Sequence, residues 1–181
     1  MIIFEETKRL ILREVLPEDE VGFYELDSDP DVHKYIGSQT IDSIEEARET
    51  IRFIRKQYID NGIGRWTVIE KSTNNFIGWS GLKLIKTQTN NHINYYDIGY
   101  RLIKRYWGNG YATEAAFASL NYGFEKLALE EIYADANIEN AGSNNVLKKV
   151  GFRLIETFEK EGIMNNWYQI KRDDWIKMSN R

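Results

Sequence analysis

Two glycines that stand two residues apart, Gly108 and Gly110, constrain the fold of this chain more than any other feature. They separate a strand-like segment from one in which apolar residues recur at helical spacing, so they mark the passage from a strand into a helix. Glycine lets the main chain adopt dihedral angles that a Cβ forbids and approach a ligand closely. The first helical turn offers unpaired N–H groups and a partial positive charge. A diphosphate is the natural ligand of such a turn.

Other phosphate-binding loops differ from this segment at identifiable positions. A dinucleotide loop of the Gly-x-Gly-x-x-Gly type needs a third glycine where Thr113 stands, and the strand before the loop here follows a meander. The loop of nucleoside triphosphatases ends in Gly-Lys-Ser or Gly-Lys-Thr, which this segment lacks. The remaining alternative is an ordinary turn that contains two glycines.

The composition bounds the class of protein. The chain has 181 residues, of which 42% are hydrophobic, so residues 1–181 suffice for one compact domain with a sizeable core. With 24 Lys and Arg against 28 Asp and Glu, the formal net charge is −4, which does not suggest a nucleic-acid partner. The chain contains no cysteine, which excludes disulfides, thiolate metal ligands and a cysteine acyl-enzyme.

Membrane and metal partners are not expected either. Residues 1–13 alternate apolar and charged side chains and contain no apolar run long enough for a signal peptide or a membrane span, so we expect a cytoplasmic location. The two histidines, His33 and His92, are far apart in the sequence and lack partners at metal-ligand spacing. We therefore expect no metal.

Periodicity predicts the order of the elements. A capping box at Ser43 and Glu46 begins a helix that ends near Gly62. Further helices are predicted after Pro17, after Gly110 and at residues 143–150. Strands are predicted at residues 8–15, 65–71, 76–86, 95–103, 131–136, 152–160 and 164–171. This order predicts an α/β protein with a mixed sheet flanked by helices.

The segment around the glycines resembles motif A of the GNAT superfamily of N-acetyltransferases, Gln/Arg-x-x-Gly-x-Gly/Ala, through Arg105, Gly108 and Gly110. Residues 98–100 and 106–115 are similar to the ribosomal-protein N-acetyltransferase (RimJ/RimL-like) subgroup, and the resemblance covers nearly the whole chain. The other matching segments are residues 7–13, 77–81, 140–143, 149–152 and 168–175. Several motifs in the same order are far more specific than one Gly-x-Gly.

The resemblance implies a single GNAT-like α/β (α+β) domain. Its central twisted sheet would be mixed, largely antiparallel and of about seven strands, splayed apart between the strand that ends near Ile103 and residues 131–136. In the family the pantetheine arm of acetyl-CoA lies in that opening, and the N–H groups of residues 105–112 bind the diphosphate. The main chain near residues 100–103 bonds the arm, which Asn140 meets from the other side. The coenzyme-binding residues so implied are Tyr100, Leu102, Ile103, Arg105, Trp107, Gly108, Asn109, Gly110, Tyr111, Ala112 and Asn140.

Asp97 is the candidate proton acceptor. Amide formation from a thioester needs a neutral amine and a proton for the departing thiolate. Asp97 matches the acidic position of the family's strand, where a carboxylate receives the amine proton through water, and it shares a strand face with Gly99. The alternative is a structural aspartate bonded to a neighbour such as Arg101.

Ser143 is the candidate proton donor. In many GNAT members a tyrosine four residues before the Gly-Phe pair protonates the thiolate, but Leu147 stands at that position here. The serine of the subgroup's Asn-x-x-Ser falls at Ser143, whose hydroxyl would donate to the sulfur. The alternative is that Ser143 caps the helix it opens.

The function implied is acetyl transfer from acetyl-CoA to a primary amine through a ternary complex. The family's acceptor cleft is formed by the helical region after the first strand and by adjacent strand faces, which implies Tyr35 and Trp66 as substrate-binding residues. The acceptor is a small molecule, such as a polyamine, amino sugar or drug, or a protein N-terminus, and the protein is a monomer or homodimer. The alternative of another class is a CoA-binding sensor or scaffold without catalysis, suggested by the missing tyrosine at Leu147.

Overall fold

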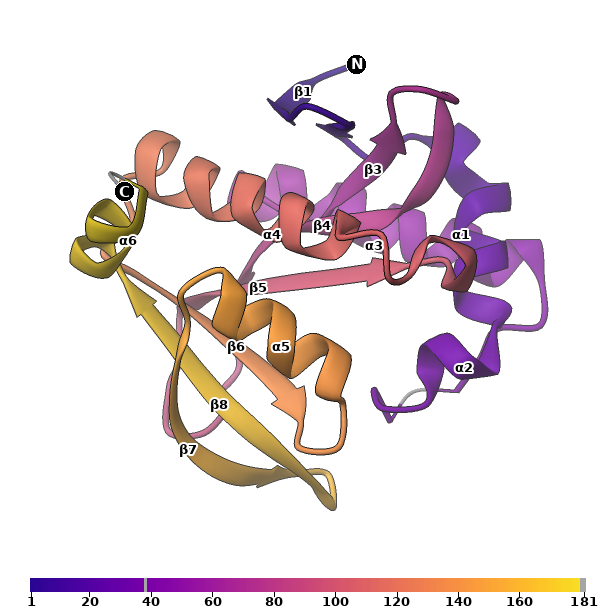
Figure 1. Cartoon of the computed structure of the whole chain (residues 1–181). Helices are drawn as coiled ribbons and strands as arrows, with labels where there is room; N and C mark the ends of the chain where they lie inside the picture. The colour runs from indigo at the N-terminus through magenta and orange to yellow at the C-terminus, as the bar shows by residue number, and fades with distance from the viewer. Residues whose placement is uncertain (38, 180–181) are drawn as a thin grey trace.

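The computed structural model describes residues 1–37 and 39–179 of the chain. In this part of the chain eight strands form one sheet in the order β1-β2-β3-β4-β5-β6-β8-β7 (Figure 1). Neighbouring strands are antiparallel except β5 and β6, which are parallel. The strands are β1 (Ile3–Glu6), β2 (Leu10–Arg13), β3 (Trp66–Glu70), β4 (Asn75–Ile85), β5 (Tyr95–Leu102), β6 (Glu131–Asn137), β7 (Arg153–Lys160) and β8 (Ile163–Lys171). The predicted α/β fold with a mixed, largely antiparallel sheet is confirmed.

The strand that the sequence did not predict is β1, at the edge of the sheet. It pairs antiparallel with β2 through contacts such as Glu6↔Ile11. The connection between them contains neither glycine nor proline, so the pattern predicted a single strand here. The side chain of Phe4 attaches β1 to the core, because its ring stacks on that of Trp66 with the centroids 4.8 Å apart.

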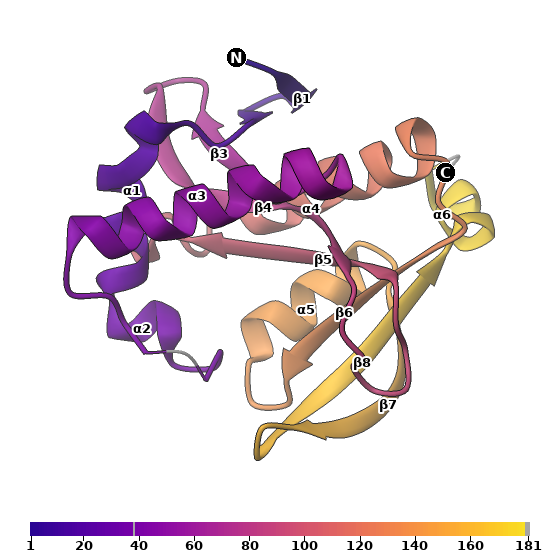
Figure 2. The same cartoon turned by 180° about the vertical axis from the view of Figure 1, so that it is seen from behind.

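Helices cover both faces of the sheet. They are α1 (Glu20–Ser28), α2 (Pro30–His33), α3 (Ile44–Asn61), α4 (Tyr111–Asn121), α5 (Ala141–Lys149) and α6 (Arg172–Ser179). α1 and α3 lie on one face, and α4 and α5 on the other (Figures 1 and 2). The predicted capping box begins α3, since the Ser43 side chain accepts a hydrogen bond from Glu46 N, and Gly62 ends the helix with a φ of 70°.

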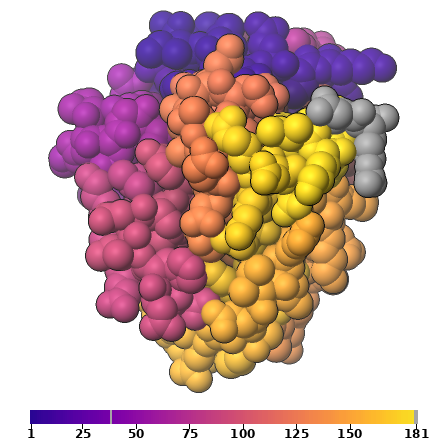
Figure 3. All heavy atoms as spheres, turned by 90° about the vertical axis from the view of Figure 1, so that its left-hand side faces the viewer, coloured from indigo at the N-terminus to yellow at the C-terminus, as the bar shows by residue number. Residues whose placement is uncertain are grey.

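The C-terminal helix α6 was not predicted from the sequence. It is held by Trp175, whose ring lies 4.7 Å from that of Phe117 and 5.6 Å from that of Phe124. Phe117 belongs to α4, and Phe124 to the π-helical turn Tyr122–Lys126 that follows it. Figure 3 shows α6 beside the end of α4. None of the helices in the described part of the chain is long and apolar enough to cross a membrane.

Each face of the sheet has its own apolar core. The larger core lies under α4 and includes buried residues of the strands and helices on that side, among them Leu82, Ile98, Ala116, Leu120, Phe124 and Tyr168. The smaller core lies under α1 and α3 and consists of Val15, Phe23, Ala47, Ile51 and Ile54, with partly buried aromatic residues packed against them. Burial on both faces fixes the sheet as the rigid layer from which the site is built.

The sheet opens between β5 and β6. β4 and β5 form a ladder of eight residue pairs, from Gly78↔Leu102 to Ile85↔Tyr95. In residues 1–37 and 39–179 the ladder between β5 and β6 has one pair, Asp97↔Tyr133. Beyond that pair the two strands diverge (Figure 1). The end of β5 that leads to the glycine loop therefore has no neighbouring strand on its β6 side.

Candidate active site

A cavity of about 1030 Å³ occupies the opening between β5 and β6. Most of the site residues predicted from the sequence line it. These are Tyr35, Asp97, Tyr100, Leu102, Trp107, Gly108, Gly110, Tyr111, Ala112, Asn140 and Ser143. The fold thus brings together residues from the turn that follows α2, from β5, from the glycine loop and from α4 and α5.

The glycine loop has the geometry that an anion site needs. Gly108 and Gly110 have φ angles of 77° and 79°, in the left-handed region that favours glycine. Gly110 is the N-cap residue of α4 and supplies no capping side chain. The N–H groups of the first turn, which begins at Tyr111, consequently face the cavity with the positive end of the helix dipole.

The loop is held in place by Arg9, a residue for which the sequence pattern predicted no role. Its Nη1 donates to the carbonyl oxygen of Asn109 at 2.9 Å, and its Nε donates to Glu114 Oε2 at 2.6 Å. The Glu114 carboxylate also accepts from Thr7 Oγ1 at 2.6 Å. Although burial acts to raise the pKa of Glu114, these hydrogen bonds lower it below its ordinary value. The matching segment of residues 7–13 therefore anchors the loop to the edge of the sheet.

Three of the predicted coenzyme-binding residues do not line the cavity. Arg105 forms an ion pair with Glu25 on the surface. The side-chain amide of Asn109 donates to the carbonyl oxygens of residues 106 and 107, so it shapes the loop from within. Ile103 is buried, and its N–H donates to the carbonyl oxygen of Ile77.

Trp66, predicted in the acceptor cleft, lies in the core instead. It is fully buried, stacks on Phe4, and packs edge-on against Tyr122 at a centroid distance of 5.0 Å. The tryptophan that does line the cavity is Trp79 of β4. Strand sequence does not say which face a tryptophan occupies when both faces are covered by helices, so the sequence offered no signal to choose Trp79.

Asp97 is paired with Arg65 rather than with the neighbour that the alternative interpretation named. Arg65 Nη2 lies 2.5 Å from Asp97 Oδ1, and Arg65 Nη1 donates to the Asp97 carbonyl oxygen at 2.9 Å. Burial raises the pKa of Asp97 above its ordinary value, opposed by the positive charge of Arg65. Arg101 forms its ion pair with Asp27, at 2.6 Å. A largely buried carboxylate with a raised pKa is well suited to accept a proton near neutral pH.

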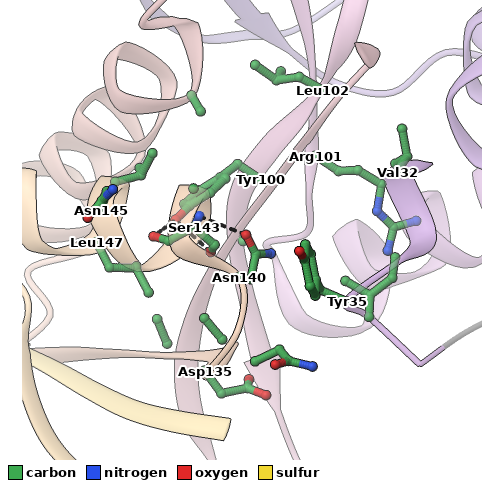
Figure 4. Close-up of a pocket in the computed structure, with 18 of the residues that line it drawn as sticks. Val32, Tyr35, Tyr100, Arg101, Leu102, Asp135, Asn140, Ser143, Asn145 and Leu147 are labelled. Carbon is green, nitrogen blue, oxygen red and sulfur yellow. Dashed lines mark hydrogen bonds between the residues drawn. The ribbon is translucent and has the colours of Figure 1, made fainter. Parts of the chain in front are cut away.

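Ser143 is placed on the opposite wall, on α5 (Figure 4). The helix begins at Ala141, and its cap is Asn140, whose Oδ1 accepts from Ser143 N at 3.0 Å. The cap of α5 is therefore Asn140 and not Ser143, contrary to the alternative interpretation. Ser143 Oγ lies 3.1 Å from the hydroxyl of Tyr100, which also donates to the Ser143 carbonyl oxygen at 3.0 Å.

Tyr100 connects the two sides of the opening, since it belongs to β5 and its hydroxyl contacts α5. Burial raises the pKa of the Tyr100 hydroxyl far above its ordinary value, so it keeps its proton at physiological pH. The expected acid position, Leu147, is buried and apolar. Two hydroxyls, those of Ser143 and Tyr100, thus stand together in this part of the cavity.

No group of three or more His, Cys, Asp or Glu side chains able to hold a metal ion occurs among the residues that the structure describes. The cavity instead is lined by the residues of the first turn of α4, by the hydroxyls of Tyr100 and Ser143 and, on the other face of β5, by the paired carboxylate of Asp97. Such a set can bind an anionic cofactor, donate a proton and accept one.

Known proteins resemble the chain in sequence and in fold. The family described as Acetyltransferase (GNAT) domain matches residues 9–153. The uncharacterised N-acetyltransferase YoaA of Bacillus subtilis (strain 168) is 31% identical over 162 residues, which cover 90% of this chain and 86% of YoaA.

Two solved structures share the fold. The crystal structure of a GNAT-family acetyltransferase from Bacillus anthracis matches with a TM-score of 0.77 and 28% identity, covering 96% of this chain and 99% of that one. Spermidine N-acetyltransferase from Vibrio cholerae, in complex with CoA and spermine, matches with a TM-score of 0.76 and 20% identity, covering 94% of this chain and 99% of that one.

Proposed function

Since this chain belongs to the GNAT acetyltransferase family and is an acetyl-CoA-dependent acyltransferase, we propose that it acetylates a primary amine by direct transfer in a ternary complex. One observation carries the proposal. The N-terminus of α4, which lacks a capping side chain, and the largely buried carboxylate of Asp97 line the same cavity. A cofactor bound at the first would present its acyl group to an amine near the second.

Coenzyme A fits the residues present. The N–H groups that begin with Tyr111 suit a diphosphate, and the edge of β5 that has no β6 partner suits an extended arm that contains amide groups. Ser143 and Tyr100 stand beside the course of that arm. The wider motif match also supports a place near the ribosomal-protein N-acetyltransferase subgroup.

The reaction requires one proton transfer at each wall of the cavity. The amine nitrogen bonds to the acyl carbon and the carbon–sulfur bond breaks, so one proton leaves the nitrogen and one is taken up by the thiolate. Asp97 accepts the first, through a water molecule, and the Ser143 hydroxyl donates the second. Tyr100 supports Ser143, because its hydroxyl can turn from the Ser143 carbonyl oxygen and donate a hydrogen bond to Ser143 Oγ as the serine proton leaves, while Tyr100 itself stays protonated.

Replacement of Asp97 by asparagine is expected to lower kcat/KM about 100-fold near neutral pH, the usual contribution of a general base. The raised pKa of Asp97 determines the direction of the pH dependence: the wild type loses activity as the pH falls and the carboxylate becomes protonated. At high pH the amine is already neutral, so the two proteins should converge. Initial rates across the pH range, read by thiol release, measure this.

A matched control is Asp19→Asn, because Asp19 is also buried and paired with an arginine, Arg13, at 2.7 Å. It does not line the cavity. The control should lose stability and keep the wild-type pH profile per folded molecule. An Asp97→Asn rate that is reduced equally at every pH would assign Asp97 a structural role.

The whole proposal is tested by binding and turnover together. Saturating CoA should raise the melting temperature, because it binds only the folded protein, whereas NAD and ATP should raise it far less. Thiol should be released from acetyl-CoA when a panel of primary amines is supplied. Binding without release from any amine would favour the CoA-binding sensor, and an unchanged melting temperature would contradict the CoA site itself.

A further inference from the structure

The two faces of β5 present different chemistry to the cavity. Successive side chains of a strand point to opposite faces, so Asp97 and Arg101 share one face while Tyr100 occupies the other. Figure 4 shows Tyr100 directed toward Ser143, and Arg101 directed the other way, toward Val32 and Tyr35. The cavity is lined by all of the residues named here, Asp97 included. The face of Arg101 is therefore the one from which an acceptor approaches Asp97.

Arg101 is fixed at one of its nitrogens only. Its Nη1 donates to Asp27 Oδ1 at 2.6 Å, and Asp27 is nearly inaccessible, with 6% of its side chain exposed against 23% for Arg101. A guanidinium has five N–H donors, and in the described part of the chain this is the one hydrogen bond that the Arg101 side chain makes. Its carbon also lies 5.2 Å from the ring centre of Trp79, which supports the group from the side.

Arg65, which contacts the same ring, does not offer its donors in the same way. Its Nη1 donates to the carbonyl oxygens of Gly81 and Asp97, and its Nη2 donates to the Asp97 carboxylate. The donors of Arg65 are thus used by the backbone of the sheet and by the Asp97 carboxylate. Arg101 is the guanidinium that keeps donors for a ligand.

The carboxylates around the cavity are mostly neutralised already. Asp31 pairs with Lys104 at 2.5 Å, Asp97 with Arg65, and Asp135 with Lys160 at 3.2 Å. The exception among the described lining residues is Glu161, in the exposed turn between β7 and β8. A polyamine would therefore find few carboxylates without a cationic partner, whereas an anion would gain charge-assisted hydrogen bonds from the Arg101 N–H groups that Asp27 does not use.

We propose that the acceptor is an amine that also carries a carboxylate, and that the carboxylate binds the Arg101 guanidinium. This rests on the proposed acetyl transfer. Asp97 and Arg101 are four residues apart, which is about 13 Å between their Cα atoms along an extended strand. The amine and the carboxylate of the acceptor are therefore separated by several bonds, as in an ω-amino acid or a short peptide.

The test compares an acid with its own amide, which share one carbon skeleton, and adds spermidine as a polyamine. We expect kcat/KM for 6-aminohexanoate to exceed that for 6-aminohexanamide, and that for spermidine, about tenfold or more, the effect of one charge-assisted hydrogen bond. Equal values for acid and amide, or a preference for spermidine, would overturn the inference. The same pair should be titrated into the CoA-saturated protein by calorimetry, with tighter binding expected for the acid.

A double variant, Asp27→Asn with Arg101→Gln, removes the guanidinium without leaving a buried unpaired carboxylate. The preference for the acid should vanish while turnover of the amide persists. Arg101→Lys keeps the charge but not the planar donors, and should show an intermediate preference for the acid. This variant provides the test if the double variant does not fold. Arg48→Gln, on the surface and paired with Glu20, is the control that should keep the full preference.

Failure of the acetyl transfer and failure of this inference give different results. If no amine releases thiol while CoA still binds, the proposed function is wrong, and the calorimetric comparison alone decides whether Arg101 binds a carboxylate. If thiol is released from many amines without regard to a carboxylate, acetyl transfer stands and the Arg101 assignment is wrong.

Discussion

Replacement of Gly110 by valine is expected to weaken CoA binding about 100-fold or more, the effect of losing two charge-assisted hydrogen bonds. Gly110 has a φ of 79°, which costs a residue with a Cβ roughly 1–2 kcal/mol. A Cβ there would meet little of the protein, since the nearest atom is an Arg9 nitrogen at 3.5 Å. The valine side chain would instead stand beside the N–H groups of α4. Calorimetric titration with CoA measures the loss.

Gly62→Val separates strain from loss of the site. Gly62 has a φ of 70°, a Cβ there would meet nothing within 4 Å, and it ends α3 away from the cavity. Both variants should therefore lose similar stability, but Gly62→Val should bind CoA as the wild type does. If the two variants bind CoA equally well, α4 does not hold the diphosphate.

Replacement of Ser143 by alanine is expected to lower kcat about 100-fold and leave CoA affinity close to that of the wild type. The hydroxyl is assigned to the departing thiolate, so its interaction matters in the transition state and little in the ground state. Because Asn140 is the cap of α5, the substitution leaves the capping hydrogen bond in place and should change the melting temperature little. Turnover, CoA affinity and melting temperature together measure this.

The matched control is Ser43→Ala, which removes a serine that does cap a helix. It should lower the melting temperature and leave turnover per folded molecule intact, the reverse of Ser143→Ala.

Tyr100→Phe removes the hydroxyl that contacts Ser143 Oγ. A combined Tyr100→Phe and Ser143→Ala variant should be no slower than Ser143→Ala alone if the two hydroxyls act as one unit. An active Ser143→Ala protein would refute the catalytic role of this serine.

Local signals predicted those elements that local physics determines. The capping box at Ser43, the glycine at position 62 and the strand-to-helix passage at Gly110 each depend on residues close in sequence, and all three are present in the structure. β1 and α6 escaped prediction because both are attached by ring contacts to distant segments, through Phe4 and Trp175. Such contacts leave no periodic signal in so short a segment.

Partners of site residues could not be read from the sequence for a similar reason. Asp97 lies near Arg101 in the chain, yet the guanidinium that reaches it belongs to Arg65, 32 residues away. Arg101 pairs instead with Asp27, 74 residues away. The choice between Trp66 and Trp79 likewise depends on how β3 and β4 present their faces, which is decided when the sheet forms.

The single ladder pair between β5 and β6 has a mechanical consequence. The strands from β1 to β5 form one continuous hydrogen-bonded plate, and β6 to β8 form another. What joins the plates away from Asp97↔Tyr133 is chiefly side-chain contact, including the bond from Tyr100 to α5. Side-chain packing takes the place of the ladder there, because Leu82 and Ile98 of the first plate and Ala134 and Tyr168 of the second are buried in one shared core. The opening is therefore built into the fold by the core that holds its two sides, and the binding of a substrate does not have to create it.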